Sequence, residues 1–466
     1  MQTNREQLNQ FITQQLNHEQ QKAVIQKNGV LLVIAGAGSG KTRIITARIA
    51  HLILNEHVPA SSILALTFTN KAAKEMKERI ELFLGDHAHP PYIGTFHSYC
   101  LRLLKKNNSL LDNQFISILD EDDQQKLLQS IITRNNIGKQ ITAKQLSYQI
   151  SHIKNQTLTP NQYETFNNKL FTSIYKAYEH EKQISKCLDF DDLLLETLKL
   201  FKKNPDFKKE FQETIRHILV DEYQDTNIVQ HALLKQMSID DSHTFISDSL
   251  CVVGDEDQSI YSWRGATVAN IINFKQDFPQ SNLIKIEQNY RSVQPILEVA
   301  NKVIEHNKNR NPKQLWSEKQ GSNRIRNLIC LSDYHEAEVI AHLIKSSRQK
   351  RKEQSIALLY RTHFQSRTLE EGLIKHSIPY KIVGGVQFYE RKEIKDLLAY
   401  LKLLINPFDR TSFFRIINTP SRGLGTKFEE QVHELWDNEP FLTFNNIINK
   451  LIEGDSQPKA KKRSCN

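Results

Sequence analysis

A short run of glycine, lysine and threonine has the composition and spacing of a phosphate-binding loop. It consists of Ala35, Gly36, Ala37, Gly38, Ser39, Gly40, Lys41 and Thr42. Glycines let backbone N–H groups close around phosphate oxygens at the start of a helix, and a helix is predicted over Arg43–Leu54. Lys41 would then reach the outer phosphates of a nucleotide, and the Thr42 hydroxyl would bind Mg²⁺. The usual pattern begins with glycine, where this sequence has Ala35.

An acidic pair, Asp221 and Glu222, follows the apolar run Ile218-Leu219-Val220. A carboxylate at a strand end beside a phosphate-binding loop can hold Mg²⁺, which is the role expected of Asp221. Its neighbour Glu222 can orient and deprotonate an attacking water as a general base. These two motifs alone do not establish hydrolysis, because P-loop kinases and GTPases carry both.

The elements that must position these residues are short apolar runs typical of buried parallel strands. We predict strands at Val30–Ala35, Ile63–Phe68, Ile215–Val220 and Leu250–Val253. A distinctive polar cluster follows each of them. In open α/β sheets, ligands bind beyond the carboxyl ends of the strands, so the four clusters predict one composite site.

Two further regions surround this sheet in the sequence. Residues 108–204 are rich in Gln, Asn, Lys and Leu at helical spacing and predict a helical insertion, with a helix starting at Asp120. A second α/β series is expected from about residue 281. Its predicted strands are Leu283–Ile286, Leu328–Leu331 and Ile356–Tyr360.

Composition narrows the function classes. The chain has 466 residues, 62 Lys plus Arg against 53 Asp plus Glu, and a net charge of +9, which permits a polyanionic partner without requiring one. No apolar run approaches the ~20 residues that span a bilayer, so no membrane association is expected. The five cysteines form no CxxC or Cys/His cluster, which argues against a zinc site or a disulfide framework. Without an apolar leader at its start, the chain is expected to be cytoplasmic.

Seven strings in order connect these features to a known family. They are Leu16-Asn-His-Glu-Gln20, Thr67-Phe-Thr-Asn-Lys-Ala-Ala73, Gly94-Thr-Phe-His97, Leu188-Asp-Phe-Asp-Asp-Leu193, Val220-Asp-Glu-Tyr-Gln-Asp-Thr-Asn227, Val253-Gly-Asp-Glu-Asp-Gln-Ser-Ile-Tyr-Ser-Trp-Arg-Gly265 and Gln288-Asn-Tyr-Arg291. From about Leu16 to Gly425 the chain resembles the Rep/UvrD/PcrA group of superfamily 1 DNA helicases, and within it the Rep type. The resemblance implies an ATP- and Mg²⁺-dependent 3′–5′ helicase or translocase acting on single-stranded DNA and single-strand/duplex junctions in replication or repair.

The resemblance also assigns roles around the nucleotide. Gln20 matches the glutamine that reads the adenine edge, and Arg43 and Tyr290 match the pair that sandwiches the adenine ring. Gln258 matches a γ-phosphate sensor. Arg291 matches an arginine finger, which offsets the charge that develops during phosphoryl transfer.

On the DNA side, the resemblance implies a platform for stacking bases, made of Phe68, Tyr261 and Trp263 with Arg264 beside them. An isolated tryptophan is more often part of a core, but the Tyr-Ser-Trp-Arg string favours a platform. Further DNA contacts are implied at Asn70, Thr95, His97 and Tyr380.

The implied fold is α/β, of the P-loop NTPase class. A RecA-like parallel sheet with a helical insertion is followed by a second, incomplete RecA-like sheet and the start of another helical insertion. The expected boundaries are 1–107 with 205–280 for the ATP-binding domain, 108–204 for its insertion, 281–383 for the second domain and 384–466 for the second insertion.

Two signature strings of the family are expected after Gly425, a Thr-Leu-His-x-Ser-Lys-Gly-Leu-Glu type and an Arg-rich helix ending in Thr-Arg-Ala, and this sequence has neither. We therefore expect a motor that is C-terminally truncated. A gene fragment, a split protein whose other half is a separate chain, and a disabled remnant stay open. The alternative function is a module that binds ATP and single-stranded DNA but does not unwind alone. A P-loop kinase or GTPase is disfavoured by the aromatic–arginine string.

Overall fold

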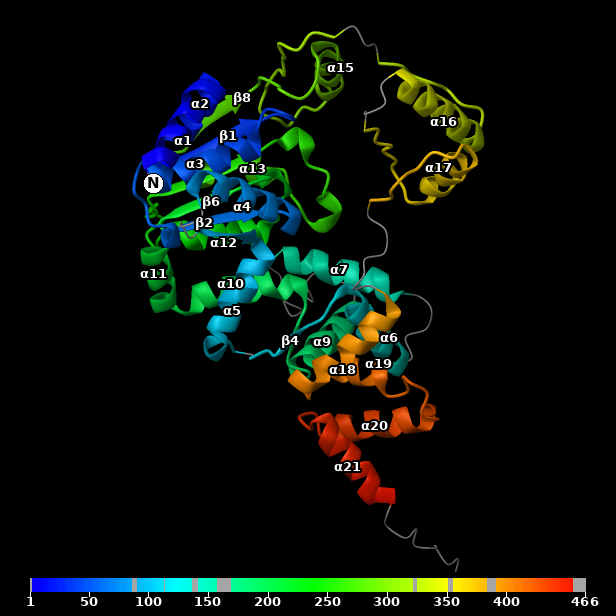
Figure 1. Cartoon of the computed structure of the whole chain (residues 1–466). Coiled ribbons are helices and arrows are strands. Elements are labelled where there is room, and N and C mark those ends of the chain that lie inside the picture. Colours follow the sequence, from blue (N-terminus) through cyan, green and yellow to red (C-terminus); the bar gives the residue numbers. More distant parts are fainter. Residues whose placement is uncertain are drawn as a thin grey trace, which may run out of the picture. The chain divides into compact units, whose positions relative to one another are not determined.

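The computed structural model of the chain describes residues 2–85, 90–112, 114–135, 141–156, 169–321, 325–350, 355–383 and 391–455. The chain divides into two compact units (Figure 1). Residues 1–321 together with 396–466 form the first unit, and residues 322–395 form the second.

A six-stranded sheet with parallel pairing throughout is the centre of the first unit. Its order is β3-β2-β6-β7-β1-β8. The strands are β1 (Gly29–Ala35), β2 (Ile63–Thr67), β3 (Tyr92–Thr95), β6 (His217–Val220), β7 (Ser249–Gly254) and β8 (Asn282–Ile286). The α/β fold class is confirmed by this sheet, including the four strands predicted to precede polar clusters.

The prediction that Leu283–Ile286 opens a second sheet is wrong. This run is β8, which pairs in parallel with β1 from Leu31↔Asn282 to Ala35↔Ile286 and forms the edge of the first sheet. A short apolar run predicts a strand but carries no information about the sheet it joins. Strand β3 was not predicted, because its sequence, Tyr-Ile-Gly-Thr, is short and only half apolar.

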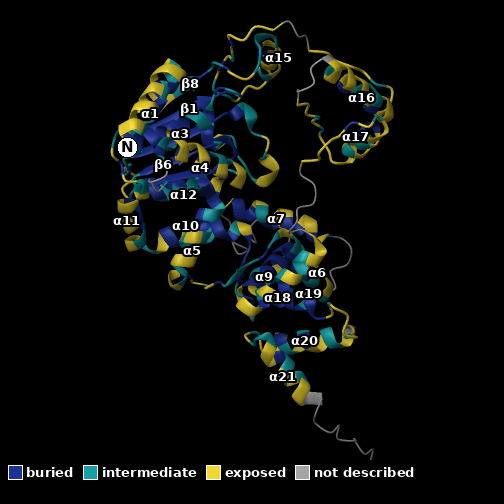
Figure 2. Ribbon diagram, viewed as in Figure 1, coloured by how far each residue is buried: buried dark blue, intermediate teal, exposed yellow. Residues whose placement is uncertain are grey.

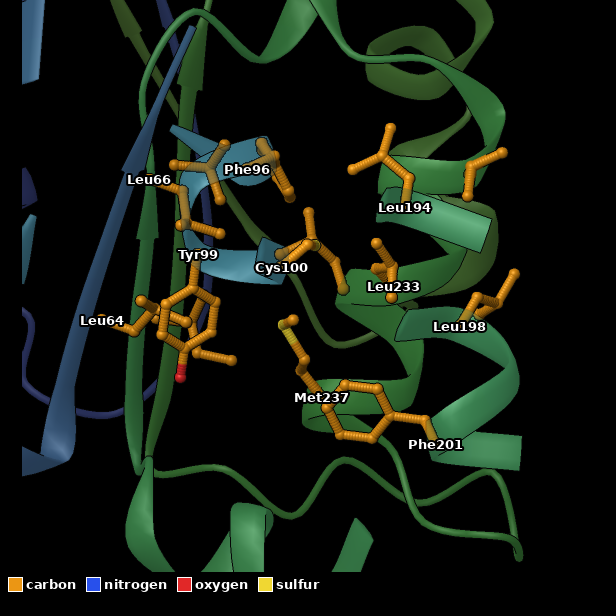
Figure 3. Packing of buried hydrophobic residues seen from close by; sticks show 14 of the residues in the cluster. Leu64, Leu66, Phe96, Tyr99, Cys100, Leu194, Leu198, Phe201, Leu233 and Met237 are labelled. Atoms are coloured by element: carbon orange, nitrogen blue, oxygen red, sulfur yellow. The ribbon is translucent and has the colours of Figure 1, made fainter. Parts of the chain in front are cut away.

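Alternate residues of the strands enter two hydrophobic cores. On one face, strand residues such as Leu31 and Val33 pack with α1 (Gln2–Gln15), α2 (His18–Ile25), α3 (Lys41–Leu54) and α4 (Asn70–Leu84). On the other face, residues such as Leu64 and Leu66 pack with Phe96, Tyr99 and Cys100 of α5 and with α10 and α12 (Figure 3). These helices are α5 (Phe96–Lys106), α10 (Phe190–Lys203), α11 (Pro205–Thr214) and α12 (Ile228–Ser238), followed by the short α13 (Ala269–Ile272) and α14 (Phe274–Asp277). Figure 2 shows that the central strands of the sheet are buried.

The helical insertion is confirmed as a separate core between β3 and β6. It contains α6 (Glu121–Arg134), α7 (Ala143–Asn155), α9 (Lys169–Ile184) and a two-stranded parallel pair, β4 (Ser117–Ile118) with β5 (Cys187–Leu188). Asp120 begins α6 as predicted, because its carboxylate accepts a hydrogen bond from the backbone N–H of Asp123 at 2.9 Å. The first turns of α10 join this insertion to the sheet.

The remaining α-helices of the described residues follow β8 in the sequence. The helices are α15 (Gln294–Ile304), α16 (Asp333–Lys350), α17 (Phe364–Lys375), α18 (Lys392–Ile405), α19 (Arg410–Ile416), α20 (Thr426–Asn438) and α21 (Phe444–Asp455). The strands predicted at Leu328–Leu331 and Ile356–Tyr360 are not formed, and apolar side chains there are exposed, Leu331 at 93% and Leu359 at 97%. A parallel strand needs a hydrogen-bonded neighbour, and no described residue supplies one here. Among the described residues, no helix has both the length and the apolar character needed to cross a bilayer.

Candidate functional site

The phosphate-binding loop lies where β1 ends and α3 begins. Gly38 and Gly40 have φ values of 68° and 92°, in the left-handed region that favours glycine. The site is also crowded, because a Cβ added to Gly38 would lie 2.7 Å from the Arg291 Cβ. The Ser39 hydroxyl donates to the Gly36 carbonyl at 2.7 Å and closes the turn.

Lys41 is a buried cation whose hydrogen-bonding capacity is unused. Its ammonium forms an ion pair with the Glu222 carboxylate, whose Oε2 lies 3.5 Å from Nζ, but it has no hydrogen-bond partner among the described residues. Leaving the N–H groups of a buried ammonium without acceptors is costly, so the site suits an anionic ligand that accepts from them. The loop and this ammonium together fit the phosphates of a nucleotide.

The two acidic residues at the end of β6 lie beside this ammonium and differ in environment. Asp221 is buried, and burial first and the negative charge of Glu222 second raise its pKa to about 7. A hydrogen bond with Thr42 opposes that rise. Glu222 is half-buried at a left-handed φ of 50°, and its Oε2 accepts a hydrogen bond from the Gln224 amide at 2.8 Å. The hydroxyl and carboxylate oxygens of Thr42 and Asp221 are ligands suited to Mg²⁺.

Side chains predicted to bind a base lie on both sides of the loop. Gln20 is fully buried, and its amide donates to the Ser39 carbonyl at 2.7 Å and accepts from the Asn17 backbone N–H at 3.0 Å. The Arg43 guanidinium donates to the Gln15 side chain at 2.8 Å, and the Tyr290 backbone N–H donates to the Gly38 carbonyl at 2.9 Å.

Sequence reasoning missed Phe11. Its ring lies 4.7 Å from the Arg43 guanidinium carbon, and both residues are only partly exposed. No sequence signal pointed to it, because a lone phenylalanine in a polar helix such as α1 reads as ordinary packing.

The segment after β7 carries the predicted sensor. The Asp255 backbone N–H donates to the Gln224 side chain at 2.9 Å, and the Gln258 amide donates to the Asp255 carboxylate. Gln224 therefore bonds both the predicted general base and the start of the sensor segment.

Two cations missed by sequence reasoning hold this acidic turn. Arg310 donates twice to Asp257, at 2.9 and 2.6 Å, and the buried Lys313 Nζ lies within 3.1 Å of carboxylate oxygens of Asp255, Glu256 and Asp257. A signal was present in the sequence, since three consecutive acidic residues require neutralisation when they are buried.

An aromatic stripe follows the sensor. The Phe68 and Tyr261 rings are 4.7 Å apart, and the Tyr261 and Trp263 rings are 6.1 Å apart. The Arg264 guanidinium lies 4.6 Å from the Trp263 ring centroid, and the Trp263 side chain is 58% exposed. Exposed rings beside a cation form a surface on which bases can stack.

Comparison with known proteins decides the family. The model for the UvrD/REP helicase N-terminal domain matches residues 16–279, and the model for the UvrD-like helicase C-terminal domain matches residues 284–454. The chain belongs to the UvrD/REP helicase family.

Relatives named ATP-dependent DNA helicase PcrA are similar to nearly the whole chain. One from Staphylococcus epidermidis is 42% identical over 428 residues, and one from Bacillus subtilis is 44% identical over 425 residues, each covering 90% of this chain. The match covers 58% and 57% of those relatives, so the chain spans somewhat more than half their length. Because both names are PcrA, the nearer likeness to Rep stays a prediction.

The other residues predicted to contact DNA differ from one another in exposure and hydrogen bonding. Asn70 is exposed at the start of α4, whereas the Thr95 hydroxyl caps α5 by accepting from the Ser98 backbone N–H at 3.2 Å. His97 packs with its ring 6.2 Å from that of Phe190, and burial lowers its pKa to about 4, so the ring is neutral at pH 7.

The two remaining predicted residues lie apart in the chain. Arg291 is exposed next to the phosphate-binding loop, and its backbone N–H donates to the Asn289 side chain at 2.8 Å. Tyr380 belongs to the second unit, where its hydroxyl donates to Glu370 at 3.1 Å.

Proposed function

We propose that this chain binds ATP with Mg²⁺, hydrolyses it, and uses the cycle to move 3′ to 5′ along single-stranded DNA and to open duplex at junctions, in replication or repair. The observation that carries the proposal is the buried Lys41 ammonium, which has no hydrogen-bond partner in the described part of the chain and lies beside Glu222. The aromatic stripe adds the second ligand class, with Phe68 after β2 and with Tyr261 and the exposed Trp263 after β7. We include a cytoplasmic location in this proposal.

Each side chain has a role in hydrolysis under this proposal. Loop N–H groups and Lys41 hold the outer phosphates, and Thr42 and Asp221 hold the metal ion. Mg²⁺, when bound, neutralises charge that develops on the phosphates. Glu222 accepts a proton from the attacking water at its carboxylate, Gln258 contacts the terminal phosphate, and Arg291 stabilises the transition state.

For the base, we propose that Arg43 and Tyr290 stack on its two faces and that Gln20 reads its edge. The Gln20 amide is engaged by Ser39 and Asn17, so reading the base requires the amide to exchange one of these bonds. Gln20 is therefore the proposed nucleotide contact that must change its hydrogen bonds most before it can bind the base.

For DNA, we propose that Phe68, Tyr261 and Trp263 carry successive bases, with Arg264 near the phosphates. Asn70 adds a polar contact from its exposed position. His97 contributes as a neutral hydrogen-bonding ring, since its lowered pKa removes the charge that would attract a phosphate. Thr95 and Tyr380 complete the proposed contacts.

We keep the domain division 1–107 with 205–280, 108–204, 281–383 and 384–466 as part of the proposal. Residues 322–395 form a compact unit, which supports a distinct second domain over the later part of 281–383, whereas residues 282–286 pair with the first sheet.

A second candidate is a module that binds ATP and single-stranded DNA but unwinds only when a separate polypeptide completes the second domain. One observation favours it. An open cavity of about 970 Å³ in the second unit is lined by the apolar residues Leu358, Tyr360 and Ile378, next to the exposed Leu359. Such a face suits strands supplied by a partner that carries the remaining family motifs.

Unwinding by the purified chain distinguishes the two candidates. A short duplex with a 3′ single-stranded tail and a matched duplex with a 5′ tail are incubated with ATP and Mg²⁺. The first proposal predicts strand separation only with the 3′ tail and only with ATP. If neither duplex opens although ATP and single-stranded DNA bind, the module is favoured, and if neither ligand binds, both candidates are refuted.

A further inference from the structure

Asn155, the last residue of α7, joins the helical insertion to two parts of the ATP-binding sheet. It is buried, and its own amide nitrogen caps α7 by donating to the Ser151 carbonyl at 2.8 Å. The same nitrogen reaches the Asp191 carboxylate at 3.3 Å, at the start of α10. The Asn155 Oδ1 is used by neither of these bonds and accepts a hydrogen bond from outside the insertion.

The first contact across the boundary is a hydrogen bond. The Asn227 Nδ2 donates to the Asn155 Oδ1 at 2.5 Å. Asn227 lies five residues after Glu222 and caps α12, because its own Oδ1 accepts from the Gln230 backbone N–H at 2.8 Å. The insertion is thereby bonded to the segment that carries the hydrolytic carboxylate.

The second contact is close packing on Gly265, which ends the aromatic loop. Gly265 has a φ of 84°, and a Cβ placed there would lie 3.1 Å from the Asn155 Cγ. The Gly265 backbone N–H donates to the Ser262 carbonyl at 3.0 Å, and two residues later the Thr267 N–H donates to the Thr226 carbonyl at 3.0 Å. Asn155 thus lies against the base of the turn that presents Trp263.

Buried ion pairs fix the position of Asn155 on the insertion side. The neighbouring Lys154 Nζ lies 2.6 Å from an oxygen of Asp189 and 2.6 Å from an oxygen of Asp192. These pairs hold the end of α7 to the start of α10, near the sheet (Figure 1). Asn155 is therefore fixed in position on the side of the insertion and contacts Asn227 and Gly265 on the other side. A residue in such a contiguous set of contacts can couple the segments that it touches.

We propose that Asn155 is a positioning residue that holds the Trp263 loop in register with the Glu222 segment, so that DNA stacked on the loop affects hydrolysis. The inference deepens the function proposed above and rests on it for the hydrolytic readout. The part of the inference that concerns structure is that the insertion holds the aromatic loop through Asn155. This part can be tested without measuring ATP hydrolysis.

Three variants of the full chain test the inference. Asn155→Ala removes the hydrogen bond with Asn227 and the amide part of the packing on Gly265, and leaves the Asn155 Cβ in place. Asn227→Asp is nearly isosteric, keeps the cap of α12 because a carboxylate also accepts from Gln230, and replaces the donor to Asn155 with a negatively charged acceptor oxygen. The matched control is Asn135→Ala. Asn135 follows α6 in the same insertion, and its Nδ2 makes the same local bond to the Ile131 carbonyl at 2.8 Å, but its side chain is exposed.

Amide hydrogen exchange of residues 264–267 is the first readout, and it needs neither ATP nor DNA. We expect these amides to exchange about fivefold faster in Asn155→Ala and Asn227→Asp, the effect of one lost hydrogen bond on local opening, and at the wild-type rate in Asn135→Ala. Wild-type exchange in both test variants, or an equal increase in the control, would overturn the inference.

ATP hydrolysis is the second readout. Both test variants should keep the rate measured without DNA and the KM for ATP, and should lose about fivefold of the DNA-stimulated kcat. Full stimulation in both variants would overturn the coupling role. If the wild-type chain hydrolyses no ATP, the proposed function fails instead, and the exchange comparison still decides whether Asn155 holds the loop.

Discussion

Replacing Trp263 by alanine should weaken binding of single-stranded DNA without affecting the fold. The indole is 58% exposed and lies against the Arg264 guanidinium at 4.6 Å, so its removal leaves no cavity in a core. The free energy of unfolding should therefore change by no more than about 0.5 kcal/mol. The loss of one base-stacking platform costs about 1–3 kcal/mol of binding free energy. This corresponds to a Kd raised about 5- to 150-fold.

Fluorescence anisotropy of a labelled oligothymidine, without nucleotide and at fixed salt, measures this Kd. Trp316→Ala is the matched control, because Trp316 is also exposed, at 43%, and lies outside the aromatic stripe. The control should bind DNA as the wild type does. An unchanged Kd for Trp263→Ala, or an equal loss in the control, would refute the assignment of the stripe as the DNA platform.

Three further substitutions test other parts of the structure. Lys41→Ala should lower ATP turnover about 10²–10³-fold, the cost of losing one donor that stabilises transition-state charge, while DNA affinity measured without nucleotide stays the same. Lys313→Met leaves the buried Asp255 and Glu256 without their cation, while Asp257 keeps Arg310, and should reduce the free energy of unfolding in urea by about 3–5 kcal/mol. An unchanged free energy of unfolding would contradict the neutralising role of Lys313. Burial lowers the pKa of His97 to about 4, so the unfolded chain binds this proton first and stability falls as pH drops from about 6.5 towards 4. The wild type should therefore lose more stability between pH 7 and pH 5 than His97→Gln does, and parallel curves would contradict the shift.

The strand, turn and helix around Lys41, where we propose that a nucleotide binds, were predictable because the sequence information for them is local. A phosphate-binding loop needs glycines, a lysine and a hydroxyl within one strand–turn–helix, and that whole unit is contiguous in the sequence around Lys41. The acidic pair Asp221 and Glu222 was predictable for the same reason, because it directly follows an apolar run that predicts a strand. The structure brings these segments to the same edge of the sheet because all six strands are parallel.

Contacts between distant segments were not predictable in this way. Lys313 neutralises Asp255 from 58 positions away, and nothing in its own neighbourhood marks it as buried. Gln20 illustrates a different limit, because its amide is engaged by a backbone carbonyl and a cap that only the fold reveals. The strands predicted at 328–331 and 356–360 fail for a third reason, since an apolar run pairs only when a neighbouring strand is present.

The most direct test of the central claim is steady-state ATP hydrolysis by the purified chain, with and without single-stranded DNA, against a Glu222→Gln control. The account predicts turnover that DNA stimulates and that falls about 10²–10⁴-fold in the control, the contribution of a general base. Turnover that is equal in wild type and control would contradict the assignment of Glu222 and with it the proposed hydrolytic site.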